Sequence, residues 1–262
     1  MISSVKNRRV AEALKLRKRG LREQRQEFLV EGAQAVTEAI RSGPVLTQLF
    51  VGPDSAVHPA TAQARQAGVP ILEVSDDVVR ALTSTVTPQG LVGVAPFIDV
   101  ALDDLPPGVD LAAVLFAVRD PGNAGTVLRS ADAAGAGVAV FSEASVDVYN
   151  PKIVRSSAGS LFHLPVVRDA PIARTIEALR RRDMSVIAAS GGGARDLYDV
   201  DLTRATAFVF GNEAWGLPEE VEALADEVVR IPIADRTESL NMATAASLFL
   251  FEAVRQRRGG RR

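Results

Sequence analysis

The stretch that decides the fold is Phe210-Gly211-Asn212-Glu213-Ala214-Trp215-Gly216-Leu217. It ends an apolar run at 206–210, which predicts a buried strand followed by a glycine-flanked turn that carries a carboxylate. Two more segments follow, Ile231-Pro232-Ile233 and Glu238-Ser239-Leu240-Asn241-Met242-Ala243-Thr244-Ala245-Ala246. We interpret them as a short strand and the start of a helix. Two strand ends and a helix start are how an α/β domain builds a ligand pocket.

An earlier segment completes the pattern: Asp120-Pro121-Gly122-Asn123-Ala124-Gly125-Thr126-Val127-Leu128-Arg129. It predicts a turn at 121–122, a cap at Asn123 and a helix over 125–134. Together the three motifs resemble those of the SpoU/TrmH RNA ribose methyltransferases of the SPOUT superfamily, in the same order and at similar spacing. The resemblance is strong over 111–256 and looser over the first 98 residues.

The resemblance implies a homodimeric, S-adenosylmethionine-dependent RNA 2′-O-methyltransferase whose catalytic domain carries a trefoil knot. The catalytic residues that it implies are Asn123, Arg129, Glu213, Ser239 and Asn241. The residues that it implies for the cofactor site are Gly211, Ile231 and Leu240. The stretch 156–160 resembles a further family signature near the pocket and the dimer interface. We expect no metal site.

Individual roles follow from the same comparison. It implies that Arg129 lies beside the target ribose. Because a guanidinium holds its proton at neutral pH, we expect this residue to position and activate the hydroxyl, and the proton acceptor stays open. Glu213 is expected to pair with Arg129 or Asn123. Gly211 should approach the cofactor closely, so that Gly211→Val weakens cofactor binding while the fold survives. For Trp215 we favour packing over stacking on a base.

The remaining sequence predicts two α/β domains. Residues 1–98 alternate strands and helices and resemble the small L30-like, RNA-binding domain that precedes the catalytic domain in many SpoU enzymes. Residues 99–110 carry proline, glycine and acidic residues and are expected to form a linker. Residues 111–262 repeat strand and helix. Their strands, including 185–189, are apolar throughout, which predicts a mostly parallel sheet with helices on both faces.

Composition narrows the classes of function. The chain has 262 residues, of which 47% are hydrophobic and 24% are charged, as is usual for globular proteins. It has no cysteine, which excludes disulfides, thiolate metal sites and a cysteine nucleophile. No apolar run has the roughly 18 residues that span a bilayer, and we find no signal peptide. We expect a soluble cytoplasmic protein.

The net charge of −2 hides a basic N-terminal stretch. Residues 6–25 contain nine Lys or Arg and only two acidic residues. Such clusters attract the phosphates of nucleic acids. The residues that we expect to bind RNA are Arg8, Arg9, Arg17, Lys18 and Arg19. A second basic cluster closes the chain at 255–262, and we favour a solvated tail for it.

Ribosomal RNA is favoured over tRNA as the substrate, and two rival functions stay open. One is a catalytically silent RNA-binding protein, against which the intact set of motif residues argues. The other is an enzyme that uses a nucleotide cofactor on a small molecule. The turn at 119–125 does not fit a Rossmann glycine pattern, and Gly191-Gly192-Gly193 lacks the Lys-Ser/Thr of a phosphate-binding loop.

Overall fold

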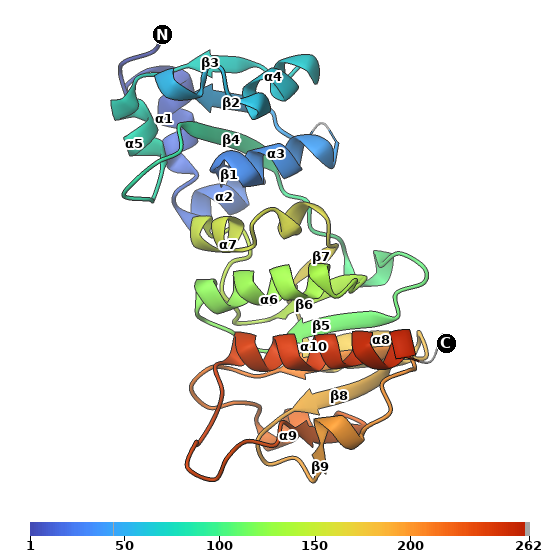
Figure 1. The fold of residues 1–262 in the computed structure, drawn as a ribbon. Helices are drawn as coiled ribbons and strands as arrows, with labels where there is room; N and C mark the ends of the chain where they lie inside the picture. Colours follow the sequence, from blue (N-terminus) through green and yellow to red (C-terminus); the bar gives the residue numbers. More distant parts are fainter. Residues whose placement is uncertain (44, 260–262) are drawn as a thin grey trace. The chain divides into compact units, whose positions relative to one another are not determined.

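The computed structural model describes residues 1–43 and 45–259 (Figure 1). The chain forms two compact units. Unit 1 comprises Met1–Ile98 and Tyr149–His163, and unit 2 comprises Asp99–Val148 and the residues from Leu164 onward. Within unit 1, the Tyr149 hydroxyl accepts a hydrogen bond from the Ile98 N–H at 2.7 Å, and its ring stacks on Phe97 at 3.9 Å between centroids. These contacts fasten the later segment of unit 1 to the earlier one.

Unit 1 is built on a four-stranded mixed sheet in the order β1-β4-β2-β3. β4 pairs antiparallel with β1 and β2, and β2 pairs parallel with β3. The elements are α1 (Arg8–Lys15), α2 (Arg19–Arg25), β1 (Glu27–Glu31), α3 (Ala33–Arg41), β2 (Gln48–Val51), α4 (Pro59–Gln66), β3 (Ile71–Glu73), α5 (Asp76–Leu82), β4 (Leu91–Pro96) and α7 (Pro151–Ser156).

The N-terminal stretch forms two helices where the apolar pattern suggests one helix that stops near Gly20. α1 ends at Lys15, and Gly20 lies inside α2. Leu16, between the helices, is 1% exposed, and its carbonyl accepts a hydrogen bond at 2.8 Å from Arg22. Because the Arg22 side chain is itself buried, this contact fixes the turn between the two helices.

Unit 2 holds a seven-stranded sheet in the order β7-β6-β5-β10-β8-β11-β9, in which every described strand pair is parallel. The elements are β5 (Leu111–Leu115), α6 (Pro121–Ala133), β6 (Val138–Ser142), β7 (Val166–Ala170), α8 (Ile172–Arg180), β8 (Ser185–Ala189), β9 (Arg195–Asp196), β10 (Thr206–Phe210), α9 (Glu219–Glu222), β11 (Glu227–Arg230) and α10 (Met242–Gly259). The predicted parallel sheet is confirmed.

Helices cover both faces of this sheet (Figure 1). Side chains alternate between the two faces along a strand. Phe208 and Phe210 meet Phe249 of α10 edge-on, with ring centroids 5.4 and 6.0 Å apart. Val209 points the other way and packs in a core cluster with Leu179 of α8. The predicted three-layer arrangement is therefore confirmed, and the trefoil knot stays a prediction.

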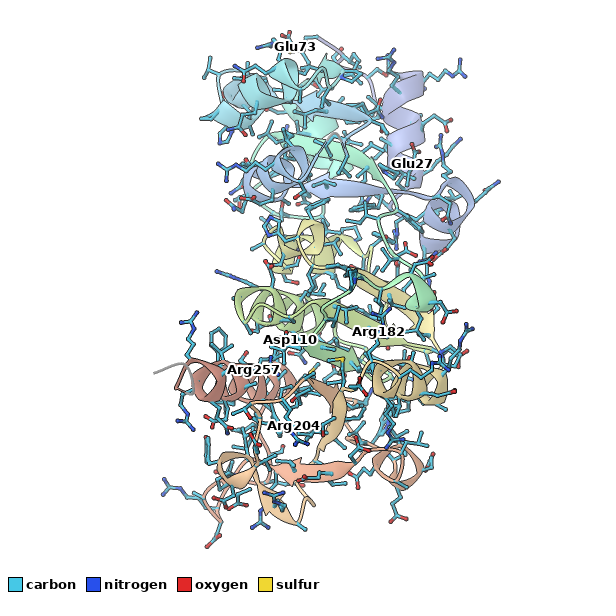
Figure 2. All side chains as sticks on the ribbon, turned by 90° about the vertical axis from the view of Figure 1, so that its right-hand side faces the viewer. Glu27, Glu73, Asp110, Arg182, Arg204 and Arg257 are labelled. Carbon is cyan, nitrogen blue, oxygen red and sulfur yellow. The ribbon has the colours of Figure 1, made fainter. Side chains whose placement is uncertain are left out.

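The segment predicted as a linker, 99–110, packs on unit 2. Leu102 and Leu105 are buried in the core cluster that also contains Leu179 of α8. The Arg182 guanidinium donates to the carbonyls of Leu105 and Pro106 at 2.9 and 3.1 Å (Figure 2). A segment that looks polar in sequence is therefore a fixed part of unit 2, because a few leucines anchor it.

The basic C-terminal cluster is partly structural. The Arg257 guanidinium donates to the Arg204 carbonyl at 2.7 Å and lies 3.6 Å from the Asp110 carboxylate (Figure 2). This side chain joins the end of α10 to the segments that lead into β10 and β5. Arg261 and Arg262 lie outside the described residues.

Candidate active site

A cavity of about 360 Å³ opens in unit 2 at the carboxyl ends of the parallel strands. Its lining comes from the ends of β8 and β10, from the loop between β11 and α10, and from the first turns of α10. Ligands bind at this edge in open α/β sheets, because the connecting loops converge there. The lining includes five of the predicted site residues, which are Gly211, Glu213, Ile231, Ser239 and Leu240.

The Glu213 carboxylate joins the turn after β10 to the loop that precedes α6. It accepts hydrogen bonds from the backbone N–H groups of Arg119 and Asp120 at 3.2 and 3.1 Å. The Asn123 side-chain amide donates to it at 3.4 Å. The expected partners of Glu213 were Arg129 and Asn123, and the structure pairs it with Asn123.

The helix that carries Asn123 begins earlier than predicted. α6 starts at Pro121 rather than Gly125, and the Asp120 carboxylate caps it by accepting from the Asn123 N–H at 2.8 Å. Proline suits the first position of a helix, since its missing N–H has no intrahelical acceptor there. Asn123 is therefore not the cap, which leaves its side chain available for other contacts.

A chain of side-chain hydrogen bonds links all three motifs. Asn123 donates to Glu213, and its Oδ1 accepts from the Asn241 side-chain amide at 3.0 Å. The Asn241 Oδ1 in turn accepts from the N–H groups of Ala243 and Thr244 at 3.0 and 3.2 Å, at the start of α10. The Glu213–Asn123–Asn241 chain thus fixes the two helix starts and the turn relative to one another.

Of the predicted catalytic residues, Arg129 is the one that belongs neither to the cavity lining nor to the Glu213–Asn123–Asn241 chain. It is exposed on α6, and it is not among the residues that line the cavity. Within residues 1–43 and 45–259 its side chain has no hydrogen-bond or ion-pair partner. Its guanidinium is therefore available to bind an external group.

Gly211 is required by the turn itself. A Cβ at this position would overlap the carbonyl group of Gly216 and lie 2.6 Å from the Leu217 nitrogen. Asn212 and Gly216 exchange backbone hydrogen bonds of 2.9 Å, which hold the turn closed at this point. Because this tight contact is with backbone, we now expect Gly211→Val to disturb the fold as well as the cofactor site.

Asn212 contributes to the site in a way that sequence reasoning missed. It is 5% exposed, and its amide donates to the Ala117 carbonyl at 2.6 Å. Its Oδ1 accepts from the Ala214 N–H at 2.8 Å. The loop 189–191 was also missed as cavity lining. Only the strand order, which places β8 beside β10, could have indicated that loop.

Comparison with known proteins assigns the family. A model described as the SpoU rRNA Methylase family matches residues 110–251, and one described as an MRM3-like substrate binding domain matches residues 7–93. The chain belongs to the SpoU rRNA methylase family. The resemblance seen in the sequence is therefore confirmed.

Two relatives and a solved structure illustrate the similarity. A 23S rRNA (uridine(2479)-2′-O)-methyltransferase from Streptomyces viridochromogenes is 37% identical, over 90% of this chain and 85% of the relative. The 23S rRNA (guanosine(2553)-2′-O)-methyltransferase RlmP of Bacillus subtilis is 29% identical, over 95% and 97%. An AdoMet-bound rRNA methyltransferase from Sinorhizobium meliloti matches with a TM-score of 0.87 and 32% identity, covering 97% of each chain.

In this SpoU family member the motif tryptophan is not packed in the core. Trp215 is 52% exposed, and the Arg119 guanidinium carbon lies 5.1 Å from the centroid of its ring. The expected packing is therefore only partial. The reason is that the turn closes through Asn212 and Gly216, which leaves the side chain between them outside the cavity lining.

The predicted RNA-binding cations lie on the surface of unit 1. All five are exposed, namely Arg8, Arg9, Arg17, Lys18 and Arg19. Some cations of this stretch have structural contacts, since Arg17 donates to the Ala81 carbonyl at 3.0 Å, and Lys15 and Arg25 pair with Glu12 at 2.8 and 2.6 Å. Arg8 and Arg9 also line a hollow of about 350 Å³.

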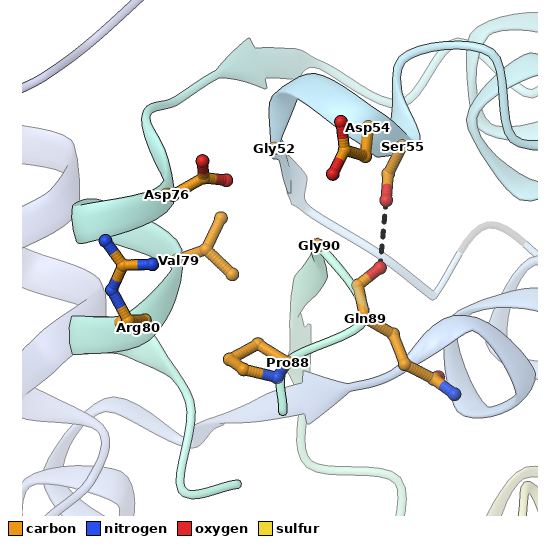
Figure 3. Close-up of a pocket in the computed structure, with 9 residues that line it drawn as sticks. All are labelled: Gly52, Asp54, Ser55, Asp76, Val79, Arg80, Pro88, Gln89 and Gly90. Atoms are coloured by element: carbon orange, nitrogen blue, oxygen red, sulfur yellow. Dashed lines mark hydrogen bonds between the residues drawn. The ribbon is translucent and has the colours of Figure 1, made fainter. Parts of the chain in front are cut away.

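A second hollow of unit 1, of about 220 Å³, has a different character (Figure 3). The carboxylates of Asp54 and Asp76 lie across it from one another. The Ser55 hydroxyl donates to the Gln89 carbonyl at 2.9 Å and is engaged within the protein. Arg80 also lines this hollow, but its guanidinium pairs with Asp77 at 2.6 Å. The two remaining carboxylates repel a phosphate, so this hollow is a poor place for an RNA backbone.

The stretch 156–160, which resembles a further family signature, belongs to unit 1, whereas the cavity lies in unit 2. Gly159 has a φ of 101°, and a Cβ there would lie 2.6 Å from Cγ of Glu38. The His163 ring nitrogen lies 3.3 Å from the Glu38 carboxylate. These contacts explain why the stretch packs with unit 1.

Two features are absent from the described part of the chain. Among residues 1–43 and 45–259, no group of three or more His, Asp or Glu side chains is arranged to hold a metal ion. In the same part of the chain, no helix combines the length and the apolar character needed to cross a membrane.

Proposed function

We propose that this protein transfers the methyl group of S-adenosylmethionine to the 2′-hydroxyl of a ribose in ribosomal RNA. The observation that carries the proposal is the Glu213–Asn123–Asn241 chain beside the cavity of a SpoU family member. Relatives named as 23S rRNA methyltransferases support ribosomal RNA over tRNA. The 2′-hydroxyl itself excludes DNA.

The cavity fits the cofactor in size and chemistry. Its volume of about 360 Å³ falls in the range of roughly 300–1,000 Å³ of small-molecule sites. Ile231, Leu240 and Phe249 offer apolar surface for the adenine, and Ser239 and Glu238 offer polar groups for the ribose and amino-acid parts. The bound cofactor supplies a methyl group activated on a sulfonium. An AdoMet-bound neighbour of similar fold supports this assignment.

The protein's own residues act by positioning. Glu213 holds the loop before α6 through two backbone N–H groups, and Asn123 extends this hold to α10. The loops that meet the methyl donor are thereby pre-organised. Arg129 binds the target ribose or its phosphate and orients the hydroxyl. Fixing both reactants in line supplies much of the rate that an enzyme gains over solution.

Unit 1 provides affinity for the RNA backbone. Its five exposed cations at 8–9 and 17–19 present positive charge on the surface of this unit. Contacts between Lys or Arg and phosphates orient an RNA but do not read its sequence. We therefore assign substrate retention to unit 1 and chemistry to unit 2.

The working assembly in this proposal is a homodimer in the cytoplasm, where ribosomal RNA is found. α10 exposes two large apolar side chains, Leu248 at 38% and Phe251 at 46%. Such side chains on one helix suit contact with a second copy. Leu248→Glu and Phe251→Glu together should yield monomers in light scattering. An active wild-type monomer at assay concentration would remove the dimer from the proposal.

The decisive experiment combines calorimetry with ribose-methylation mapping. Calorimetry should show S-adenosylmethionine binding to the purified protein. Ribose-methylation mapping of total RNA should show one site lost from 23S ribosomal RNA in a deletion strain and restored by the intact gene. A site lost from tRNA would move the substrate to that RNA. A protein that binds RNA but no S-adenosylmethionine would be a silent RNA-binding protein instead.

A further inference from the structure

Arg119 and Trp215 form an exposed pair beside the methyl-transfer cavity. The Arg119 guanidinium carbon lies 5.1 Å from the Trp215 ring centroid, within the distance of a cation–π contact. The backbone N–H of Arg119 also holds the Glu213 carboxylate at 3.2 Å. The pair is therefore built from the same two loops as the candidate active site.

The position of the indole is fixed by the turn that carries it. Ala214 and Gly216 line the cavity, whereas Trp215 between them does not. Mutual backbone hydrogen bonds between Asn212 and Gly216, and the Asn212 side chain on the Ala214 N–H, keep the turn rigid. The ring is thus held on the outer side of the turn, two residues from Glu213.

Among the described residues of unit 2, this ring is not part of the buried core. It is 52% exposed and is absent from the core cluster of buried residues. A large aromatic side chain contributes to folding mainly through the area that it buries, and here about half of that area faces solvent. The Arg119 guanidinium covers one face of the indole, so the other face is the one that can contact a ligand.

Base recognition is the chemistry that matches this arrangement. Unpaired RNA bases stack on aromatic rings and on arginine planes, because every base has a π-face. Because Ala214 and Gly216 of the same turn line the cavity, a nucleotide whose ribose reaches the cavity brings its base, or a neighbouring one, to this turn. The positive charge of Arg119 also favours the approach of the phosphates.

We propose that Trp215 and Arg119 form a stacking platform that positions a base of the RNA substrate next to the methyl-transfer cavity. This inference rests on the proposed function and names one of its positioning elements. Stacking is tolerant of base identity, so the platform orients the nucleotide and leaves sequence selection to other contacts.

Substitutions separate stacking from packing. Trp215→Ala should raise the KM for unmethylated 23S ribosomal RNA transcribed in vitro by roughly 5- to 150-fold, the usual effect of losing one stacked base. Affinity for S-adenosylmethionine and the melting temperature should stay unchanged. Trp215→Phe should recover much of the loss, and Trp215→Leu should not, because leucine has bulk but no π-face. Equal rescue by leucine and phenylalanine would overturn stacking.

The matched control is Tyr198→Ala. Tyr198 is another aromatic residue of unit 2, it is 53% exposed, and it does not line the cavity. It should leave the KM for the transcript unchanged. A loss equal to that of Trp215→Ala would mean that any exposed aromatic matters, and the platform would be rejected.

A second readout needs no turnover. The chain has a single tryptophan, so its fluorescence reports on Trp215 alone. Adding the transcript should quench this fluorescence to saturation, because a stacked base quenches an indole. Light scattering should show the same assembly for wild type and Trp215→Ala. A shift to smaller species would assign the ring to contact with a second copy and would overturn the proposal.

The two proposals fail in different ways. If the wild type methylates the transcript while Trp215→Ala has an unchanged KM and the wild-type fluorescence is not quenched, only the platform is wrong. If the transcript quenches the fluorescence of the wild type but no RNA is methylated, the platform stands as an RNA contact and the methyltransferase function falls. Neither methylation nor quenching would remove both.

Discussion

At the residue scale, the site depends on hydrogen bonds between groups that are far apart in sequence. The Asn212 amide reaches the Ala117 carbonyl across 95 positions, and Asn241 reaches Asn123 across 118. Motif residues such as Glu213 could be identified from the sequence because the pattern marks them. The buried role of Asn212 could not, since it depends on a backbone carbonyl at the end of another strand.

Arg129 can be tested apart from the cofactor. Arg129→Ala should reduce methyl transfer by about 100- to 1,000-fold, the usual effect of removing one group that stabilises a transition state. Binding of S-adenosylmethionine, measured by calorimetry, should stay near normal because Arg129 does not line the cavity. Arg129→Lys should rescue poorly, since an ammonium lacks the planar fork. Substantial turnover by the alanine variant would exclude Arg129 from the reaction.

Two glycines that line the same cavity should respond differently to substitution by alanine. Gly211→Ala should lower both the melting temperature and the affinity for S-adenosylmethionine, because its Cβ would overlap the backbone of Gly216. Gly191 also lines the cavity, but a Cβ there meets nothing within 4 Å, so Gly191→Ala should unfold like the wild type. Thermal unfolding with and without cofactor measures both. Normal stability of Gly211→Ala would mean that the turn can relax.

At the scale of elements, strands were easier to predict than helix starts. β8 and β10 have the predicted bounds of 185–189 and 206–210, because continuous apolar runs mark strands buried on both faces. α6 begins four positions before its predicted start at Gly125. The signals were present in Asp120 and Pro121, a capping carboxylate followed by proline. These two residues mark a helix start only if the preceding loop is known to end at Asp120.

The layer between β10 and α10 should dominate the stability of unit 2. Phe208 is fully buried and meets Phe249 edge-on at 5.4 Å. Phe208→Ala should lower the free energy of unfolding by about 3–5 kcal/mol, as expected for a large buried aromatic side chain. Tyr198→Ala, which truncates a half-exposed ring, should change it far less. Urea unfolding followed by circular dichroism measures both, and equal losses would contradict this account of the layer.

At the scale of the whole molecule, composition and pattern predicted two α/β parts but not how the chain is shared between them. The stretch 149–163 lies inside the family match at 110–251 and yet packs in unit 1. Periodicity describes each helix and strand locally. It contains no information about long-range contacts, such as that of Tyr149 with Ile98. The leucines that anchor 99–110 were hidden among acidic residues for the same reason.

The distribution of charge provides the last test. Arg8, Arg9 and Lys18 are exposed, and their side chains have no hydrogen-bond or ion-pair partner within the described part of the chain. Replacing all three with alanine should weaken RNA binding and reduce the slope of log affinity against log salt by roughly 0.7 to 0.9 per lost phosphate contact. Binding of S-adenosylmethionine, in unit 2, should not change.

The matched control changes the net charge by the same amount. Arg174, Arg181 and Arg195 are exposed cations of unit 2, and each is paired with a carboxylate. Their triple alanine variant should bind RNA with nearly the wild-type salt slope, because an arginine already neutralised by a carboxylate releases few counterions from a phosphate. Equal losses in the two triple variants would mean that RNA responds to net charge alone. An unchanged slope in the N-terminal variant would assign RNA binding to unit 2.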